Sequence, residues 1–349
     1  MKFVVFSLMA NLPHAITGER WTDGQKIASV LQQAQWVEQL GYDAYGIGER
    51  HGEPFLSSSP AVMLTAIAAH TSHIRLLTTV TVLSVLDPVR VAEDYATLDQ
   101  LSGGRLELII GKGNDPRHYP LFGLREEEQW DSLQERYELL RRLWREEAID
   151  WSGQYRPALR QFTSQPRPLQ APIPIWHGSA SSARSTELAA RYGEPIFSSN
   201  TFHRPEKYKQ LIDHYRERLE YYGYDPGSAI VGAGAGALYI ADTAEEAVRR
   251  YRPYYDSFQS TDTAKHNASP FDSLEDYIAN GPALVSSAEQ VAEKILRYQK
   301  WFGHEVLGIS VDGLTASEQQ EQLERFAIEV APIIRREVSS NIWKEKQPI

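Results

Sequence analysis

Charged and imidazole side chains gather in the segment that directly follows Ile47. The run Gly48–Glu53 contains Glu49, Arg50 and His51, so one short loop presents a carboxylate, a fixed cation and an imidazole. Histidine can donate or accept a proton near neutral pH, and an adjacent cation can hold negative charge that develops in a reaction. A surface cluster of ion pairs is the competing interpretation. We take Glu49, Arg50 and His51 as candidate catalytic residues.

A second segment, Gly111–Asp115, combines glycine with a lysine. Glycine lets a backbone approach a ligand closely, and the ammonium of Lys112 is a point charge suited to phosphate. A glycine-rich turn that carries an exposed lysine is the alternative. We expect Lys112 and Asn114 to contact a ligand, with the lysine as the main anion contact.

A third segment, His177–Ser182, opens a predicted helix with small residues and hydroxyls. The free backbone N–H groups and the dipole at a helix N-terminus attract anions such as phosphate. Plain serine capping needs only one of these hydroxyls. The segment therefore predicts an anion site, and its candidate binding residues are His177, Gly178, Ser179, Ser181 and Ser182.

Other chemistries find little support. The chain has no cysteine, which removes disulfides, thiolate metal sites and cysteine nucleophiles. Neither His51 with Glu53 nor His70 with His73 has a recognised metal-ligand spacing, so we expect no metal site. The run Gly232–Ala237 formally fits a dinucleotide fingerprint, but it continues into Leu238-Tyr239-Ile240 and not into a helix, which favours a closely packed strand.

Composition limits the class of protein. The 349 residues include 36 Lys and Arg against 46 Asp and Glu, a formal net charge of −10, and 42% are hydrophobic. The apolar content suffices for a large core, and the acidic balance argues against nucleic acid as a partner. No apolar run approaches the roughly 18 residues of a membrane span. We expect a cytoplasmic protein without nucleic-acid or membrane partners.

Strand-like and helical patterns alternate along the chain. Eight strand-like runs are each followed by at least one helical pattern, and such units close into a (β/α)8 barrel more readily than they spread into an open sheet. A doubly wound sheet with a small second domain is the runner-up. The predicted strands are Phe3–Phe6, Tyr42–Ile47, Ile74–Leu83, Arg105–Ile110, Ile173–His177, Pro195–Ser198, Ala235–Ile240 and Val306–Val311.

We expect a single domain over residues 1–349. A Pro-rich connection, Trp151–Pro172, forms an insertion after the fourth unit, and Ser260–Pro282 is irregular. In a barrel, the active site lies at the carboxyl ends of the strands. The three chemistry-bearing segments follow the second, fourth and fifth predicted strands, so they should meet there.

The stretch Leu40–His51 resembles the signature of the bacterial luciferase-like, flavin-dependent monooxygenases. Asp87–Asp94 and Leu98–Arg105 are similar to the third helix of that family and to the start of its fourth strand. The resemblance runs from the first strand to the last helix. It is weakest at Ser260–Pro282, where luciferases carry a mobile lid.

This resemblance implies an enzyme that binds reduced FMN at the carboxyl end of the barrel. It would use O2, through a flavin 4a-hydroperoxide, to oxygenate a small organic substrate. Lys112 falls where the family has an arginine for the FMN phosphate, and Thr79 and Val80 match the position of an unusual cis peptide against the flavin ring. The resemblance also implies a homodimer, and since no nicotinamide fingerprint is present, a separate flavin reductase.

Two departures from the luciferase pattern separate this chain from light emission. The luciferase catalytic histidine falls on Arg50, and its reactive cysteine falls on Gly111. We therefore expect a monooxygenase that emits no useful light. Two alternatives stay open: a deazaflavin-dependent oxidoreductase that transfers hydride without oxygen, and a flavin-binding protein without catalysis.

Overall fold

Eight parallel strands close into a barrel, in a computed structural model that describes residues 1–201, 203–261 and 269–343. The closed hydrogen-bonded ring confirms the predicted (β/α)8 barrel and removes the open-sheet alternative. In order around the ring, the strands are β1 (Lys2–Ser7), β2 (Ala44–Ile47), β3 (Arg75–Val82), β4 (Leu106–Gly111), β7 (Ile175–Ser179), β8 (Ile196–Ser198), β9 (Val231–Gly234) and β12 (Val306–Ile309).

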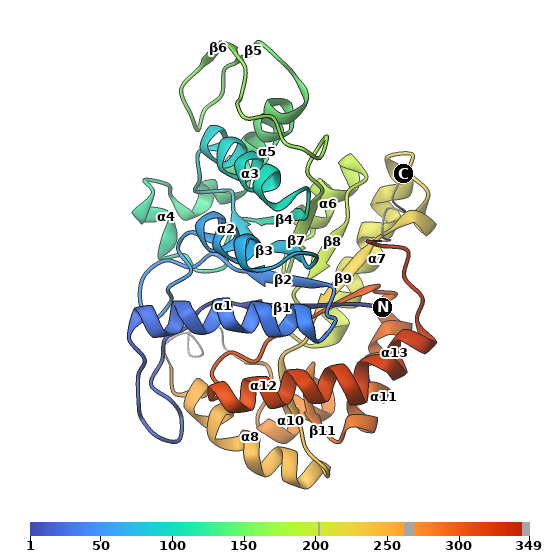
Figure 1. The fold of residues 1–349 in the computed structure, drawn as a ribbon. Helices are drawn as coiled ribbons and strands as arrows, with labels where there is room; N and C mark the ends of the chain where they lie inside the picture. The colour runs from blue at the N-terminus through green and yellow to red at the C-terminus, as the bar shows by residue number, and fades with distance from the viewer. Residues whose placement is uncertain (202, 262–268, 344–349) are drawn as a thin grey trace.

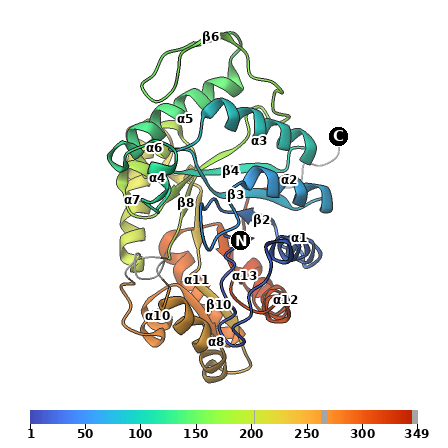
Figure 2. The same cartoon turned by 90° about the vertical axis from the view of Figure 1, so that its left-hand side faces the viewer.

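Helices surround this barrel, as Figures 1 and 2 show. The N-terminus, where β1 begins, lies at the right of Figure 1 and α4 lies at the left, so the carboxyl ends of the strands face left. The helices are α1 (Asp23–Gln39), α2 (Pro60–His70), α3 (Pro88–Ser102), α4 (His118–Leu121), α5 (Gln129–Arg145), α6 (Ala183–Tyr192), α7 (Pro205–Tyr221), α8 (Ala244–Gln259), α10 (Leu274–Asn280), α11 (Ala288–Phe302), α12 (Ala316–Arg325) and α13 (Ala331–Glu337).

The predicted position of the seventh barrel strand, Ala235–Ile240, is wrong. The barrel strand is β9, and β10 (Ala237–Ile240) pairs with β11 (Ala283–Ser286) in a separate parallel sheet. Glycine is required in β9 because the Phe197 ring fills the barrel there: a Cβ on Gly232 would lie 2.4 Å from Phe197 Cδ2. The small residues of β9 therefore belong to the barrel. The more apolar run after them, β10, lies outside the barrel and contacts α8 and α12. The run is strand, as predicted, and not a dinucleotide loop.

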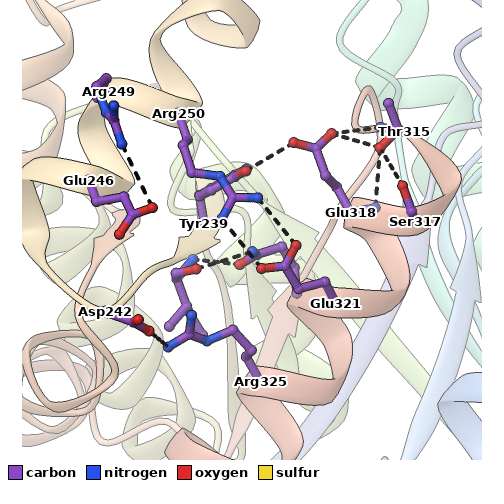
Figure 3. A network of polar contacts seen from close by, with 12 residues as sticks. Tyr239, Asp242, Glu246, Arg249, Arg250, Thr315, Ser317, Glu318, Glu321 and Arg325 are labelled. Atoms are coloured by element: carbon purple, nitrogen blue, oxygen red, sulfur yellow. Dashed lines mark hydrogen bonds and ion pairs between the residues drawn. The ribbon is translucent and has the colours of Figure 1, made fainter.

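A polar network fastens the small sheet to α12 (Figure 3). The Tyr239 hydroxyl donates to Glu318 Oε1 at 2.9 Å, and Glu318 also takes part in the capping box at the start of the helix. Two turns further on, Arg325 forms an ion pair with Asp242 at 3.0 Å. These contacts fix the sheet outside the barrel.

Two excursions leave the regular barrel pattern. The insertion after the fourth unit contains a hairpin of β5 (Ile149–Trp151) and β6 (Leu159–Phe162), which projects at the top of Figure 1. In the segment Ser260–Pro282, residues 262–268 lie outside the described residues. The described part forms α10, which contacts β11 and α8.

Tryptophan and glutamate side chains close the amino end of the barrel. Glu107, buried inside the ring, accepts hydrogen bonds from Trp176 Nε1 at 2.7 Å and Trp343 Nε1 at 2.6 Å, and forms an ion pair with Arg75 at 2.7 Å. A cavity of about 670 Å³ adjoins Trp176 and Trp343 at this end. The chemistry-bearing loops lie at the opposite end. No helix within the described ranges is both long and apolar enough to cross a bilayer.

His304 makes the stability of this fold sensitive to acid. The side chain is fully buried before β12, both ring nitrogens have no partner among the described residues, and burial lowers its pKa to about 3. In the unfolded chain, His304 takes up a proton as the pH falls through about 6.5, whereas in the folded chain it stays neutral. The free energy of unfolding therefore decreases as the pH is lowered through this range. Between pH 7 and pH 5, the native protein should lose about 2 kcal/mol more unfolding free energy than His304→Leu.

Urea unfolding at both pH values measures this difference. The exposed His73, replaced by Gln, serves as the control and should leave the pH dependence unchanged. An identical pH dependence in the native protein and His304→Leu would show that His304 is not the acid-sensitive group.

Candidate active site

Glu49 and His51 form a carboxylate–imidazole pair after β2. Glu49 Oε1 lies 2.9 Å from His51 Nε2, and Oε2 accepts the backbone N–H of Val82 at 2.8 Å. The Glu49 side chain is only 1% exposed, so both of its oxygens are fixed. A neutral His51 that donates Nε2–H to Glu49 keeps Nδ1 as a proton acceptor. The geometry allows His51 to take and return a proton at Nδ1, with Glu49 stabilising the imidazolium.

His118, from the loop after β4, packs against this pair. Its ring centroid lies 5.2 Å from that of His51, with the planes perpendicular, and Nε2 accepts the His51 backbone N–H at 3.4 Å. Burial lowers the pKa of His118, and its Nδ1 has no partner in the described chain. Hydrogen bonds from Arg117 lower the pKa of the neighbouring Asp115 to about 2. No sequence spacing links His118 to His51, which lie 67 residues apart.

Arg50 and Asn114, both predicted site residues, meet across the same two loops. The Arg50 guanidinium donates through Nη1 to Asn114 Oδ1, and its central carbon lies 5.7 Å from the centre of the Phe55 ring. Burial lowers the pKa of Arg50. The structure therefore places this cation next to the Glu49–His51 pair.

Lys112 lies beside the start of α6, through a shared contact with Trp130. Its ammonium is 5.9 Å from the Trp130 ring centre, and the guanidinium carbon of Arg184 is 5.6 Å from the same ring. Lys112 Nζ also donates to the Gly113 carbonyl at 2.9 Å, and burial lowers the pKa of this ammonium. Arg184, in the first turn of α6, forms an ion pair with Asp131 at 2.6 Å, which leaves the Lys112 ammonium as the cation available to an anion near this helix start. Trp130 and Arg184 carried no local motif that could have marked them.

The floor of the site is built around Val80. The Thr79–Val80 peptide bond is cis, as the resemblance implied. A Cβ on Gly178 would lie 3.0 Å from Val80 Cγ1, and one on Gly111 would lie 3.1 Å from Val80 Cγ2. Glycines at both positions therefore leave room for the Val80 side chain. The structure brings Thr79, Val80 and Gly178 together on the barrel axis.

The remaining predicted residues after β7 divide between two faces. Trp176 and Gly178 face the barrel, so alternation turns His177 and Ser179 toward the helices. His177 Nε2 lies 2.9 Å from Glu194 Oε2, and its ring packs on Tyr137, so His177 lies apart from the other candidates. The motif alone could not indicate this, because it ignores which face each strand residue occupies.

The three serines of this segment also differ in position. Ser179 Oγ is buried and has no partner within the described chain. Ser182 caps α6, accepting the Arg184 N–H at 3.2 Å, and Ser181 is exposed. Across the described residues, no three His, Asp or Glu side chains are grouped so that they could hold a metal.

A closed parallel barrel with a buried carboxylate–imidazole pair beyond its strand ends has the architecture of a barrel enzyme. Comparison with known families names the class. The family model described as luciferase-like monooxygenase matches residues 1–305, and the chain therefore belongs to the luciferase-like monooxygenase family.

Named relatives in this family are monooxygenases. The chain is 26% identical over 323 residues to 4-hydroxyprotoasukamycin monooxygenase of Streptomyces nodosus subsp. asukaensis, covering 86% of this chain and 85% of the relative. It is 23% identical over 349 residues to the oxygenase component of flavin-dependent trigonelline monooxygenase of Acinetobacter baylyi, covering 94% of each.

Solved structures share the fold. The oxygenating constituent of 3,6-diketocamphane monooxygenase from Pseudomonas putida, in complex with FMN, aligns with a TM-score of 0.78 at 21% identity, covering 95% of this chain and 98% of that one. An F420-dependent secondary alcohol dehydrogenase aligns with a TM-score of 0.74 at 18% identity, covering 96% and 99%. At these identities the likeness concerns the fold alone.

The contacts of His118 predict the direction in which its protonation responds to its neighbours. Burial should hold its titration midpoint below the ordinary value of 6.5. Asp115→Asn removes a negative charge that favours the imidazolium, so the midpoint should fall further. Arg50→Gln removes a repelling cation, so the midpoint should rise. Histidine NMR titration measures these shifts, with the resonance assigned by its loss in His118→Gln, and a midpoint at or above 6.5 would contradict the geometry.

Proposed function

We propose that the chain is the oxygenase of a two-component system that uses reduced FMN and O2 to oxygenate a small organic substrate. One observation carries this proposal. The side chain of Val80, flanked by glycines, forms the floor of the site, and Lys112 and the start of α6 lie at the strand ends above it. The apolar floor suits a flavin ring, and the adjacent anion site suits the flavin phosphate. The names of the relatives support the oxygenase assignment.

The residues present fit FMN at both of its ends. Lys112 and the first turn of α6, with Ser181 and Ser182, would hold the phosphate. Gly178 and Val80 would lie against the ring. When bound, reduced FMN supplies the two electrons with which O2 is activated.

The Glu49–His51 pair and Arg50 would serve the chemistry beside the ring. His51 holds or moves a proton at Nδ1, while Glu49 keeps its ring oriented. Phe122, whose ring centre is 4.8 Å from that of His51, covers the imidazole and keeps water away. Arg50 offers a fixed positive charge where negative charge develops or where an acidic substrate binds.

The proposal extends to the partners of the enzyme. We infer that a separate reductase delivers the reduced flavin, because one relative is named as the oxygenase component of its system. A second copy of the chain is the expected oligomeric partner, and α2 offers an apolar outer face at Val62, which is 67% exposed. We place the enzyme in the cytoplasm on the sequence grounds given above.

A deazaflavin-dependent hydride transfer is the second candidate. The aligned F420-dependent alcohol dehydrogenase shows that this barrel also hosts such chemistry. Oxygen consumption separates the two functions, since only the first requires O2. Tight flavin binding without turnover would favour the third possibility, a flavin-binding protein without catalysis.

Lys112 should discriminate between flavins that differ only in the phosphate. Replacing Lys112 with Gln removes a charge-assisted contact, so FMN affinity should fall about 10- to 100-fold, while riboflavin affinity changes little. Lys209→Gln, which removes a lysine from the exposed face of α7, is the matched control. Fluorescence titration with both flavins measures the effect. Equal weakening of FMN and riboflavin would show that Lys112 does not contact the phosphate.

His51 should couple oxygen use to product formation. With any substrate that the enzyme turns over, His51→Ala should reduce product formation about 100-fold, while the bound reduced flavin still consumes O2 and releases hydrogen peroxide. Glu49→Gln keeps the shape but weakens the orienting charge, so its effect should be smaller. The ratio of product formed to oxygen consumed is the measurement, and an unchanged ratio in His51→Ala would remove this residue from the mechanism.

A further inference from the structure

Arg50 forms no direct ion pair with an acidic side chain of the described chain, although the nearby Asp115 carboxylate favours its charged form. Its hydrogen bond goes to the neutral amide oxygen of Asn114, and its guanidinium lies over the Phe55 ring. The side chain is partly buried, and burial lowers its pKa. Burying a guanidinium without a direct counter-ion is costly, so an anion that pairs with Arg50 would be stabilised here.

The acids closest to Arg50 are already committed. Arg117 grips Asp115 with three hydrogen bonds, from Nε at 2.9 and 3.2 Å and from Nη2 at 2.6 Å. Both oxygens of Glu49 are held by His51 and by the Val82 backbone. Neither carboxylate can turn to Arg50 without losing these bonds. A carboxylate that pairs directly with Arg50 would therefore come from outside the described chain.

Aromatic side chains surround the same point. Phe55 lies under the guanidinium, and Phe122, 40% exposed, packs edge-on against His51. A guanidinium presents a planar fork that matches the two oxygens of a carboxylate. The aromatic ring of a ligand would pack against the phenylalanine side chains beside it. These features together describe a site for a planar aromatic acid.

We propose that Arg50 binds the carboxylate of the substrate, and that the substrate class is small aromatic carboxylic acids. This assignment rests on the proposed oxygenase function, which it deepens. Lys112 serves the cofactor phosphate in this arrangement, and Arg50 serves the substrate. The acid would then lie next to the Glu49–His51 pair, the proton-handling group of the site.

Benzoate and benzamide provide a direct test because they differ in charge and little in shape. We expect the full chain, loaded with oxidised FMN, to bind benzoate at least tenfold more tightly than benzamide in calorimetric titrations. Arg50→Gln should abolish this preference, and Arg50→Lys should retain part of it because the charge remains while the fork is lost. Arg125→Gln, which removes an exposed, ion-paired arginine from the loop between α4 and α5, is the matched control and should keep the preference.

Asp115→Asn tests the proposal in the opposite direction. Removing this negative charge strengthens the positive potential at Arg50, so benzoate should bind a few-fold more tightly. This variant and Arg50→Lys also decide the matter if thermal melting shows that Arg50→Gln does not fold.

Three results would overturn the assignment: equal binding of benzoate and benzamide, unchanged benzoate binding in Arg50→Gln, or a loss of FMN in place of benzoate in that variant. The last result would make Arg50 a cofactor contact. Failure of the proposed function looks different. If the apo-protein keeps the Arg50-dependent preference for benzoate but does not bind reduced FMN, the acid site stands and the oxygenase assignment falls.

Discussion

Closure of the parallel barrel is the constraint on which the site depends. The pairing of β1 with β12 completes the ring, and because all eight strands run in one direction, every strand ends at the same rim. Loops that are 67 residues apart in sequence, carrying His51 and His118, thereby come into contact. Hydrogen bonds from Trp176 and Trp343 to Glu107 fill the interior of the other end.

Hydrogen bonding around that rim leaves positive charge exposed to ligands. Two acids at the rim are engaged by local partners: Glu49 by His51 and Asp115 by Arg117. Among the described residues, Lys112 near the start of α6 and Arg50 near the imidazoles form no direct ion pair. A chain of net charge −10 thus keeps two positive side chains at the rim where we propose the active site. One suits a cofactor phosphate and the other suits a substrate carboxylate.

Local patterns in the sequence were sufficient for the barrel and for much of its rim. The predicted strand Arg105–Ile110 corresponds to β4, and Arg50 meets Asn114 as expected for neighbouring loops. What failed depended on distant packing. The Phe197 ring requires glycine in the barrel strand, so β9, and not the more apolar run after it, takes that place. His177 is on the outer face of β7, where it contacts Glu194 and lies apart from the other candidate residues.

Other site residues could not be recognised because their partners lie on distant segments. Trp130 and Arg184 acquire meaning only when α5 and α6 lie side by side beside Lys112. His118 likewise becomes informative only through its contact with His51.

Anaerobic titration with reduced FMN, and in parallel with a reduced deazaflavin, is the decisive test of the proposal that the chain uses reduced FMN. We expect tight binding of reduced FMN that depends on Lys112, with weak or no deazaflavin binding. Binding of the deazaflavin in preference to FMN would contradict it.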